Sequence, residues 1–199
     1  ILWVVEMLCS WAFFLFFSLS GIALAIETPD YQIIDTLPDS VEVRKYAGAT
    51  IASTTVASGI RESGNIGFRR LAGYIFGDNE LNKKIKMTAP VMQQRKGEES
   101  YEVVFFLPRD LSAPPRPSNR DVLIKDINME VAVLAYKGGW KVKTYEENLE
   151  TLKSRLAENE KWKISGDPIW ARYDPPWMPS FLRSNDIMLP AVGRSCKSK

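Results

Sequence analysis

The chain of 199 residues contains one pattern of elements twice, and this duplication limits the folds open to it more than any other feature. Two strand-like stretches, a helix-like stretch and two further strand-like stretches fall within residues 41–108, and the same order recurs within residues 122–190. A sheet face and one helix in either half cannot enclose a core alone, so the two halves must pack together. The sequence therefore predicts an α+β fold, in which the two units form one distorted antiparallel β-barrel with two helices packed on it.

Hydrophobic periodicity places the elements within each half. A helix over residues 144–158 has one apolar face, made of Tyr145, Leu149, Leu152 and Leu156. Its start is expected at a capping box formed by Thr144 and Glu147. Gly48 is expected to turn the chain between two strands of the first half. The expected strands are 41–46, 50–58, 87–94, 101–108, 122–127, 129–137, 169–173 and 186–189.

A second amphipathic helix, in the first half, precedes a basic loop. Its apolar residues have the i, i+3, i+4, i+7 spacing of one helical face, and Gly77 stands where a left-handed C-cap is usual. Cations border this face, and a methionine follows it. Such a surface suits a flat, apolar, anionic ligand, although the same pattern also fits a helix that simply covers the core. The candidate ligand contacts are Phe68, Arg69, Arg70, Leu71, Ala72, Ile75, Lys84 and Met87.

Several short motifs accompany this helix in a fixed order. Residues 68–79 fit the pattern FxxLxxYIxGxN, and residues 84–91 fit KIxMTxPV. Further pieces are EVRKY at 42–46, FFLP at 105–108, ARYDPPW at 171–177 and FLRSN at 181–185. In this combination the chain resembles the SOUL haem-binding family. The resemblance implies the duplicated barrel and the reversible, non-covalent binding of haem or another tetrapyrrole in an apolar groove, for carriage, buffering or sensing.

The same duplicated plan also resembles the effector-binding domains of some bacterial drug-responsive regulators, which hold flat aromatic ligands. This second resemblance concerns the fold alone.

The residues available to ligate haem iron are few. The chain contains no histidine, which is the commonest axial ligand. Met87, Met92 and Tyr74 remain as candidates, whereas Cys196 lies in the polar C-terminal tail. We therefore expect haem to be held without a strong axial ligand.

The resemblance also implies cations that receive the haem propionates, one just before the motif tyrosine and one at the helix start. This chain has Gly73 and Asn65 at those places. Arg69 and Arg70, one helical turn away, are expected to substitute, with Lys83 and Lys84 as further candidates.

Several function classes lack support in the sequence. No GxSxG elbow, phosphate-binding glycine loop or metal-spaced set of Cys, Asp and Glu occurs, so we expect no enzyme, no catalytic residue and no metal site. The net charge is +2 and positive and negative residues alternate, which argues against a nucleic-acid partner. A monomer is expected.

The alternative function is a protein-interaction module without haem, or a binder of another flat hydrophobic molecule. In that case the helix face is filled by the core, and Trp177 in its proline-rich segment docks a protein. The same segment could instead lock the last strand onto the barrel. Arg172 and Arg183 are expected to brace it through carboxylate pairs.

The N-terminal segment differs in composition from the rest of the chain. Residues 7–26 carry no charge, and Ala23-Leu24-Ala25 is the small-x-small pattern that a signal peptidase accepts. We expect a signal peptide at residues 1–25, the folded domain at 26–193 and a disordered polar tail at 194–199. An uncleaved membrane anchor is the alternative, since 20 apolar residues can cross a bilayer. Both readings predict an exported protein, in the periplasm, the secretory pathway or the extracellular space, with membrane contact only if the segment stays uncleaved.

Overall fold

The computed structural model describes residues 26–194, so the predictions for residues 1–25 and 195–199 lie outside the described residues. The strands are β1 (Gln32–Leu37), β2 (Val41–Ala57), β3 (Val91–Arg95), β4 (Ser100–Phe106), β5 (Leu123–Lys137), β6 (Trp162–Ile164), β7 (Ile169–Arg172) and β8 (Ser184–Gly193). The helices are α1 (Ile60–Phe76) and α2 (Val142–Ala157), with short 3-10 turns η1 (Pro38–Ser40) and η2 (Ser180–Leu182).

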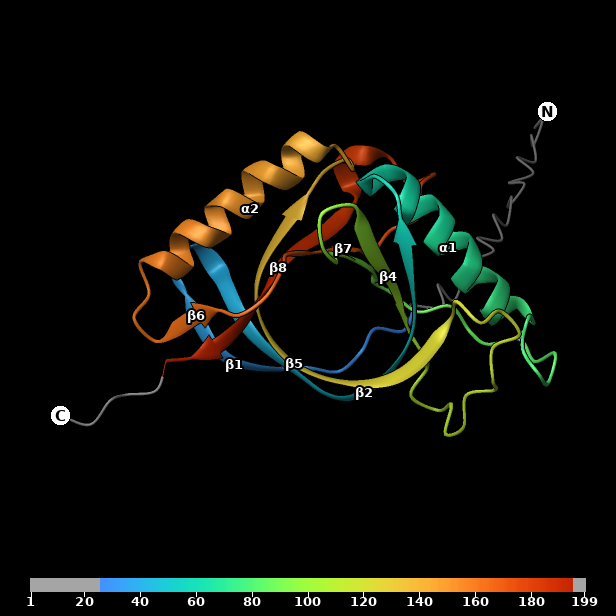
Figure 1. Ribbon diagram of the computed structural model, residues 1–199. Helices are drawn as coiled ribbons and strands as arrows, with labels where there is room; N and C mark the ends of the chain where they lie inside the picture. The colour runs from blue at the N-terminus through green and yellow to red at the C-terminus, as the bar shows by residue number, and fades with distance from the viewer. Residues whose placement is uncertain (1–25, 195–199) are drawn as a thin grey trace, which may run out of the picture.

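The strands close into a barrel, and the two helices lie outside it (Figure 1). Strands β2, β4, β3, β7, β8 and β5 follow one another around the wall, and an antiparallel pairing of β2 with β5 completes the circle. Strand β1 adds to β2, and β6 pairs with β8. The predicted antiparallel barrel with two helices is therefore confirmed.

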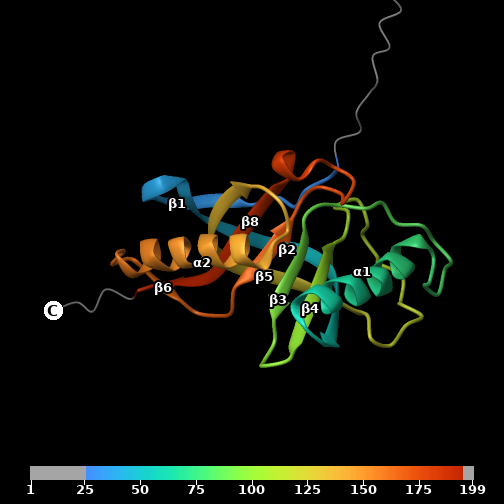
Figure 2. The same ribbon diagram turned by 90° about the horizontal axis from the view of Figure 1, so that it is seen from above.

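The predicted duplication is visible in the pairing pattern. In the first half, β4 pairs with both β2 and β3, and in the second half β8 pairs with both β5 and β7. Two seams, β2 with β5 and β3 with β7, join the halves. Seen from above, α1 and α2 lie on either side of the β3–β4 hairpin (Figure 2).

The first strand of each half is longer than predicted. Strand β2 runs for 17 residues and β5 for 15, without the breaks expected near Gly48 and Asn128. A bulge between Ala47 and Ala49 absorbs one extra residue of β2, and Gly48 takes a φ of 69° there. The Gly48 amide donates to Oδ1 of Asn128, 3.0 Å away on β5. The residues that indicate turns therefore mark a bend between two continuous strands.

Neighbouring residues of the strands face different cores. On β4, Phe105 belongs to the hydrophobic cluster under α1, whereas Phe106 belongs to a second cluster with Met188 of β8. On β5, Ala132 belongs to the cluster under α2, and Val131 belongs to the second cluster. Because the helices cover the outside of the wall, the second cluster fills the barrel interior.

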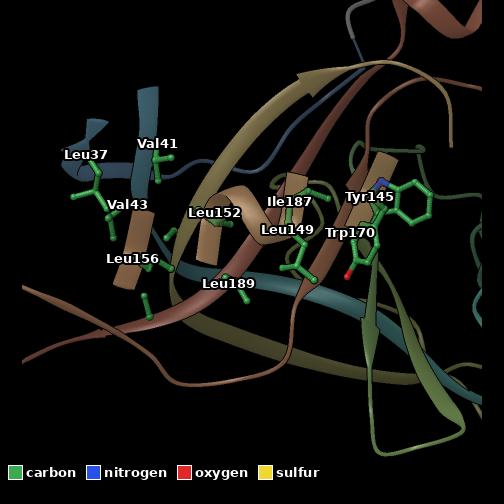
Figure 3. Close-up of a cluster of buried hydrophobic side chains, with 12 residues drawn as sticks. Leu37, Val41, Val43, Tyr145, Leu149, Leu152, Leu156, Trp170, Ile187 and Leu189 are labelled. Carbon is green, nitrogen blue, oxygen red and sulfur yellow. The ribbon is translucent and has the colours of Figure 1, made fainter. Parts of the chain in front are cut away.

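Helix α2 packs on the barrel with the face that the sequence predicts. Tyr145, Leu149, Leu152 and Leu156 are all buried against β2, β7 and β8 (Figure 3). The predicted capping box is wrong, because the helix begins at Val142 and no side chain caps its start. Thr144 lies inside the first turn, and its carbonyl accepts a hydrogen bond from Asn148.

Helix α1 begins earlier than predicted, at Ile60, and ends as predicted at Gly77, whose φ is 128°. Strand β3 begins at Val91 rather than at residue 87, because the chain from Asn82 to Pro90 is irregular. Strands β1 and β6 were not predicted. Within residues 26–194, neither helix is both long and apolar enough to cross a membrane.

Candidate functional site

The predicted ligand face of α1 divides into two parts in the structure. Leu71 and Ile75 are 0% and 1% exposed, within the cluster between α1 and the barrel wall. Phe68 is 41% exposed, with its ring edge packed on Phe105 of β4 at a centroid distance of 5.3 Å. The expectation that Leu71 and Ile75 line an open groove with Phe68 is therefore wrong, because the protein itself covers both side chains.

An exposed apolar stripe runs beside this buried face. Phe68, Ala72 and Phe76 follow one another at i, i+4 and i+8, which places them along one flank of the helix. We call these three residues the α1 outer flank. Phe76 is 65% exposed, and Ala72 between the two rings is partly exposed. The sequence reasoning missed Phe76, although its spacing of eight from Phe68 was the available signal.

The predicted cations lie on different sides of α1. Arg70 is held by Asp121, with Nη1 to Oδ2 at 3.3 Å, and it lies 3.4 Å from the Thr54 hydroxyl of β2. Arg69 and Lys84 are exposed, and no carboxylate in the described part of the chain lies within ion-pair distance of either. Arg69 and Lys84, and likewise the exposed Lys83, are thus the predicted cations that remain available to an anionic ligand.

The basic loop after α1 is fixed by buried motif residues. Asn79 is 2% exposed, and its Nδ2 donates to the carbonyls of Tyr74 and Lys83 at 3.0 and 2.8 Å. The Ile85 amide donates to the carbonyl of Ile75 at 2.8 Å, which holds Lys84 beside the C-terminal end of the helix. Much of the motif therefore encodes the connection between α1 and its loop.

The candidate axial ligands differ in accessibility. Tyr74 is 1% exposed and donates to the carbonyl of Pro115 at 3.0 Å, and burial raises the pKa of its phenol to about 12. Met92 is buried in the barrel interior, whereas Met87 packs partly exposed beside the α1 cluster. Between residues 26 and 194 no three Cys, Asp or Glu side chains gather in a metal-binding group. Cys196 lies outside the described residues.

Three hollows of the described surface adjoin residues 26–31. One of about 280 Å³ is lined by Tyr31, Tyr46, Tyr173 and their neighbours. Within it Arg44 donates to Asp186 at 2.8 Å, and the Tyr173 hydroxyl donates to the same carboxylate at 2.7 Å. This hollow is slightly below the roughly 300–1,000 Å³ of small-molecule sites. Three of its polar side chains, those of Arg44, Tyr173 and Asp186, already satisfy one another.

The segment between β7 and β8 exposes three large apolar side chains. Trp177 is 83%, Phe181 72% and Leu182 48% exposed. Arg183 braces the segment by donating to the carbonyls of Met178, at 2.8 Å, and Pro176. The predicted carboxylate pairs of Arg172 and Arg183 are wrong, since Arg172 instead donates to the Gln93 amide oxygen.

Comparison with known proteins agrees with this fold and with the motifs. A family model described as "SOUL heme-binding protein" matches residues 26–190, and the chain belongs to that family. Heme-binding protein 2 of Mus musculus is 36% identical over 179 residues, covering 83% of this chain and 86% of the relative. Heme-binding protein 2 of Homo sapiens is 36% identical over 181 residues, covering 84% and 87%.

Solved structures show the same architecture at much lower identity. The EcmrR C-terminal domain aligns with a TM-score of 0.54 at 11% identity, covering 81% of this chain and 98% of that domain. EcmrR in its cryo-EM complex with DNA gives a TM-score of 0.58 at 12% identity, covering 81% and 57%. At these identities the likeness concerns the fold alone.

Proposed function

We propose that the chain binds haem or another tetrapyrrole, reversibly and without a covalent bond, on the α1 outer flank. The observation that carries the proposal is the exposed stripe of Phe68, Ala72 and Phe76, with the cations Arg69 and Lys84 close by. Neither cation forms an ion pair within residues 26–194. Membership of a family described by haem binding, and two relatives named for it, support the tetrapyrrole as the ligand. The family description names binding rather than catalysis.

The stripe has the chemistry that such a ligand requires. Removing apolar surface from water stabilises a complex by about 25 cal/mol per Å², so covering about 200 Å² contributes roughly 5 kcal/mol. Ala72 is small, so a flat macrocycle can approach the helix between the two phenylalanine rings. Arg69 and Lys84 meet the carboxylates at the rim of the macrocycle. Leu71 and Ile75 do not contact the ligand, and they support the site by packing α1 against the barrel.

Iron ligation is proposed to be weak. The sequence offers no histidine, and Tyr74 and Met92 are buried, which leaves Met87 as the partly exposed candidate. The ferric complex should therefore have the absorption spectrum of a five-coordinate or weakly ligated haem. We also propose that the protein is exported, that it acts as a monomer and that it contacts a membrane only if residues 1–25 stay attached.

The binding surface is tested by haem titration and urea unfolding of three alanine variants. Phe68→Ala and Phe76→Ala should each weaken haem binding about tenfold, from the loss of roughly 1.4 kcal/mol of contact. Their free energy of unfolding should change far less than that of a core variant, because both side chains are exposed. Leu71→Ala is the matched control, and it should cost about 2–5 kcal/mol of stability while the folded protein binds haem normally.

The charge contribution is tested with haem dimethyl ester, whose propionates carry no charge. Arg69→Gln and Lys84→Gln should weaken haem and leave the ester unaffected. Unchanged haem affinity in Phe68→Ala and Phe76→Ala would exclude the flank as the binding surface. A low-spin six-coordinate spectrum that disappears in Met87→Ala would overturn the proposal of weak ligation.

A second candidate function is a protein-docking surface on Trp177, Phe181 and Leu182, which their high exposure favours. Replacing Trp177 by Ser should abolish such docking and leave haem affinity unchanged.

A further inference from the structure

Two arginines without carboxylate partners enclose one tryptophan near the start of α2. The guanidinium carbon of Arg172 lies 5.6 Å from the ring centroid of Trp140, and that of Arg183 lies 4.5 Å from it. Neither arginine forms an ion pair with any carboxylate in residues 26–194. Two cations without a carboxylate at ion-pair distance therefore share one aromatic ring.

Arg172 is the more deeply placed of the two. Strand register sets Tyr136 of β5, Asn185 of β8 and Arg172 of β7 side by side on the outer face of the barrel. The guanidinium carbon also lies 4.8 Å from the ring of Trp170, and Nη2 donates to the neutral amide of Gln93. Burial lowers the pKa of Arg172 to about 10, so the group still carries its charge at neutral pH. A buried charge without a counter-ion is costly and calls for a partner.

Three buried polar groups at this point have no hydrogen-bond partner among the residues that the structure describes. They are Nε of Arg172, Nε1 of Trp170 and the hydroxyl of Tyr136. Burial raises the pKa of Tyr136, and the nearby Trp170 indole partly opposes that rise. The indole and the hydroxyl nevertheless do not meet the geometry of a hydrogen bond. All three groups can donate, so the cluster has more donors than acceptors.

The neighbouring polar groups cannot provide the missing acceptor. Nε1 of Trp140 donates to Oδ1 of Asn185 at 3.0 Å, and Nδ2 of Asn185 donates to the carbonyl of Gly138 at 3.0 Å. Asp186, the next carboxylate along β8, faces the barrel interior, where it accepts from Arg44. The Tyr136 hydroxyl could accept from one of the two nitrogens, but the other nitrogen and the hydroxyl's own hydrogen would still need an acceptor from outside the described residues.

We propose that Arg172, Trp170 and Tyr136 form a binding site for one oxyanion, a carboxylate or a phosphate group. A water molecule could satisfy the donors, but only an anion also balances the charge of Arg172. Arg172, Trp140 and Tyr136 are each partly exposed, so one side of the cluster adjoins solvent. The site borders the first turns of α1, since a Cβ added to Gly64 would lie 3.5 Å from Nη2 of Arg172. None of its residues belongs to the α1 outer flank, and the site does not depend on the proposed haem function. The anion is either free in solution or the propionate of a tetrapyrrole.

The test measures the unfolding temperature of the full chain in sodium phosphate or sodium acetate, against sodium chloride of equal ionic strength. Phosphate or acetate should raise the unfolding temperature of the wild type, because a ligand of the folded state stabilises it. Arg172→Gln should lose this rise. Tyr136→Phe, which removes only the unpaired hydroxyl, should weaken the anion about tenfold.

Arg95→Gln is the matched control. Arg95 also lies over an aromatic ring, at 5.8 Å from Tyr101, but it is exposed and outside the cluster. It should respond to the anions as the wild type does. Should Arg172→Gln fail to fold, the test compares the anion-induced rise in unfolding temperature of Tyr136→Phe with that of Arg95→Gln. A smaller rise in Tyr136→Phe supports the site. The proposal is overturned if the wild type responds no more than it does to chloride, or if the cluster variants respond as strongly as the wild type.

Competition identifies the source of the anion. Phosphate that displaces haem but not haem dimethyl ester from the wild type, and displaces neither from Arg172→Gln, would show that a propionate occupies the site. Phosphate that binds without displacing haem would show a site for a free anion. Both results support the anion site. A protein that does not bind haem at all would not contradict the site, because the unfolding temperature tests it independently.

Discussion

Two ion pairs lie at the margins of the apolar barrel interior. Asp186 lies two residues before the interior Met188, and Arg44 pairs with it at 2.8 Å. Glu102 lies two residues before the interior Val104, and Nζ of Lys125 contacts it at 2.6 Å. Each pair sits where the apolar filling of the barrel meets solvent.

The Glu102 pair makes stability depend on pH. Burial pushes the pKa of Glu102 upward, but the hydrogen bond and the charge of Lys125, with the Ser53 hydroxyl, outweigh it and hold the pKa below its usual value. A carboxyl whose pKa is lower in the folded than in the unfolded protein stabilises the fold above the unfolded pKa, about 4.3. That contribution is lost as the pH falls through the lower folded pKa. Glu102→Gln should therefore cost about 1–3 kcal/mol at pH 7.

Urea midpoints measured between pH 3 and pH 7 test this prediction. The gap between wild type and Glu102→Gln should narrow as the pH falls below about 4. Glu98→Gln, at an exposed residue of the β3–β4 turn, is the control and should follow the wild type. A difference in urea midpoint that stays constant between pH 3 and pH 7 would contradict the lowered pKa of Glu102.

The candidate site was only partly predictable from single residues. Periodicity identified Phe68 and Ala72, which are exposed, together with Leu71 and Ile75, which are not. A helix that is apolar over more than half of its circumference does not reveal which part meets the barrel. Of the three unpartnered donors around Arg172, two lie on β7 and one, the Tyr136 hydroxyl, lies on β5, so only the register of the folded sheet brings them together.

At the scale of elements, the fit of α1 to the barrel depends on a glycine. A Cβ added to Gly67 would lie 2.7 Å from Cβ of Val103 on β4 and nearer still to one of its methyl groups. Gly67→Ala should therefore destabilise the protein by about 1–3 kcal/mol through overpacking, although alanine favours helix by about 1 kcal/mol. Asn65→Ala, at an exposed position of the same helix, should leave stability equal or higher. A Gly67→Ala variant as stable as the wild type would show that α1 can lift off β4 without cost.

The elements themselves were predictable where one side of the segment faces a core. Tyr145, Leu149, Leu152 and Leu156 define α2 correctly because the helix has a polar outer side. The sequence prediction divided β2 and β5 into two strands each, near Gly48 and Asn128. Both residues are turn-forming in most contexts. Here they face each other at a bulge, and that pairing joins positions 80 residues apart, which local sequence cannot reveal.

At the scale of the whole molecule, the chain just after the predicted signal peptide is tied to the barrel domain. The family match starts at residue 26, and the carbonyl of Glu27 accepts from the Ala89 amide at 2.8 Å. We predict that the mature protein begins at Ile26, because Ala23 and Ala25 suit the small-residue requirement of a signal peptidase. Mass spectrometry of the protein from its host checks this. Peptides containing residues 11–17, recovered from a membrane fraction, would instead indicate an anchor.

The two seams of the barrel have a consequence for cooperativity. Every hydrophobic cluster draws on both halves: Val43 joins Leu152 under α2, Phe106 joins Met188 inside the barrel, and Leu71 joins Val122 under α1. Neither half keeps a complete core if the other unfolds, so partial unfolding of one repeat is not a stable intermediate and the domain should melt in a single transition. A spectroscopic probe placed under one helix should therefore report the lower unfolding temperature caused by a destabilising substitution under the other helix.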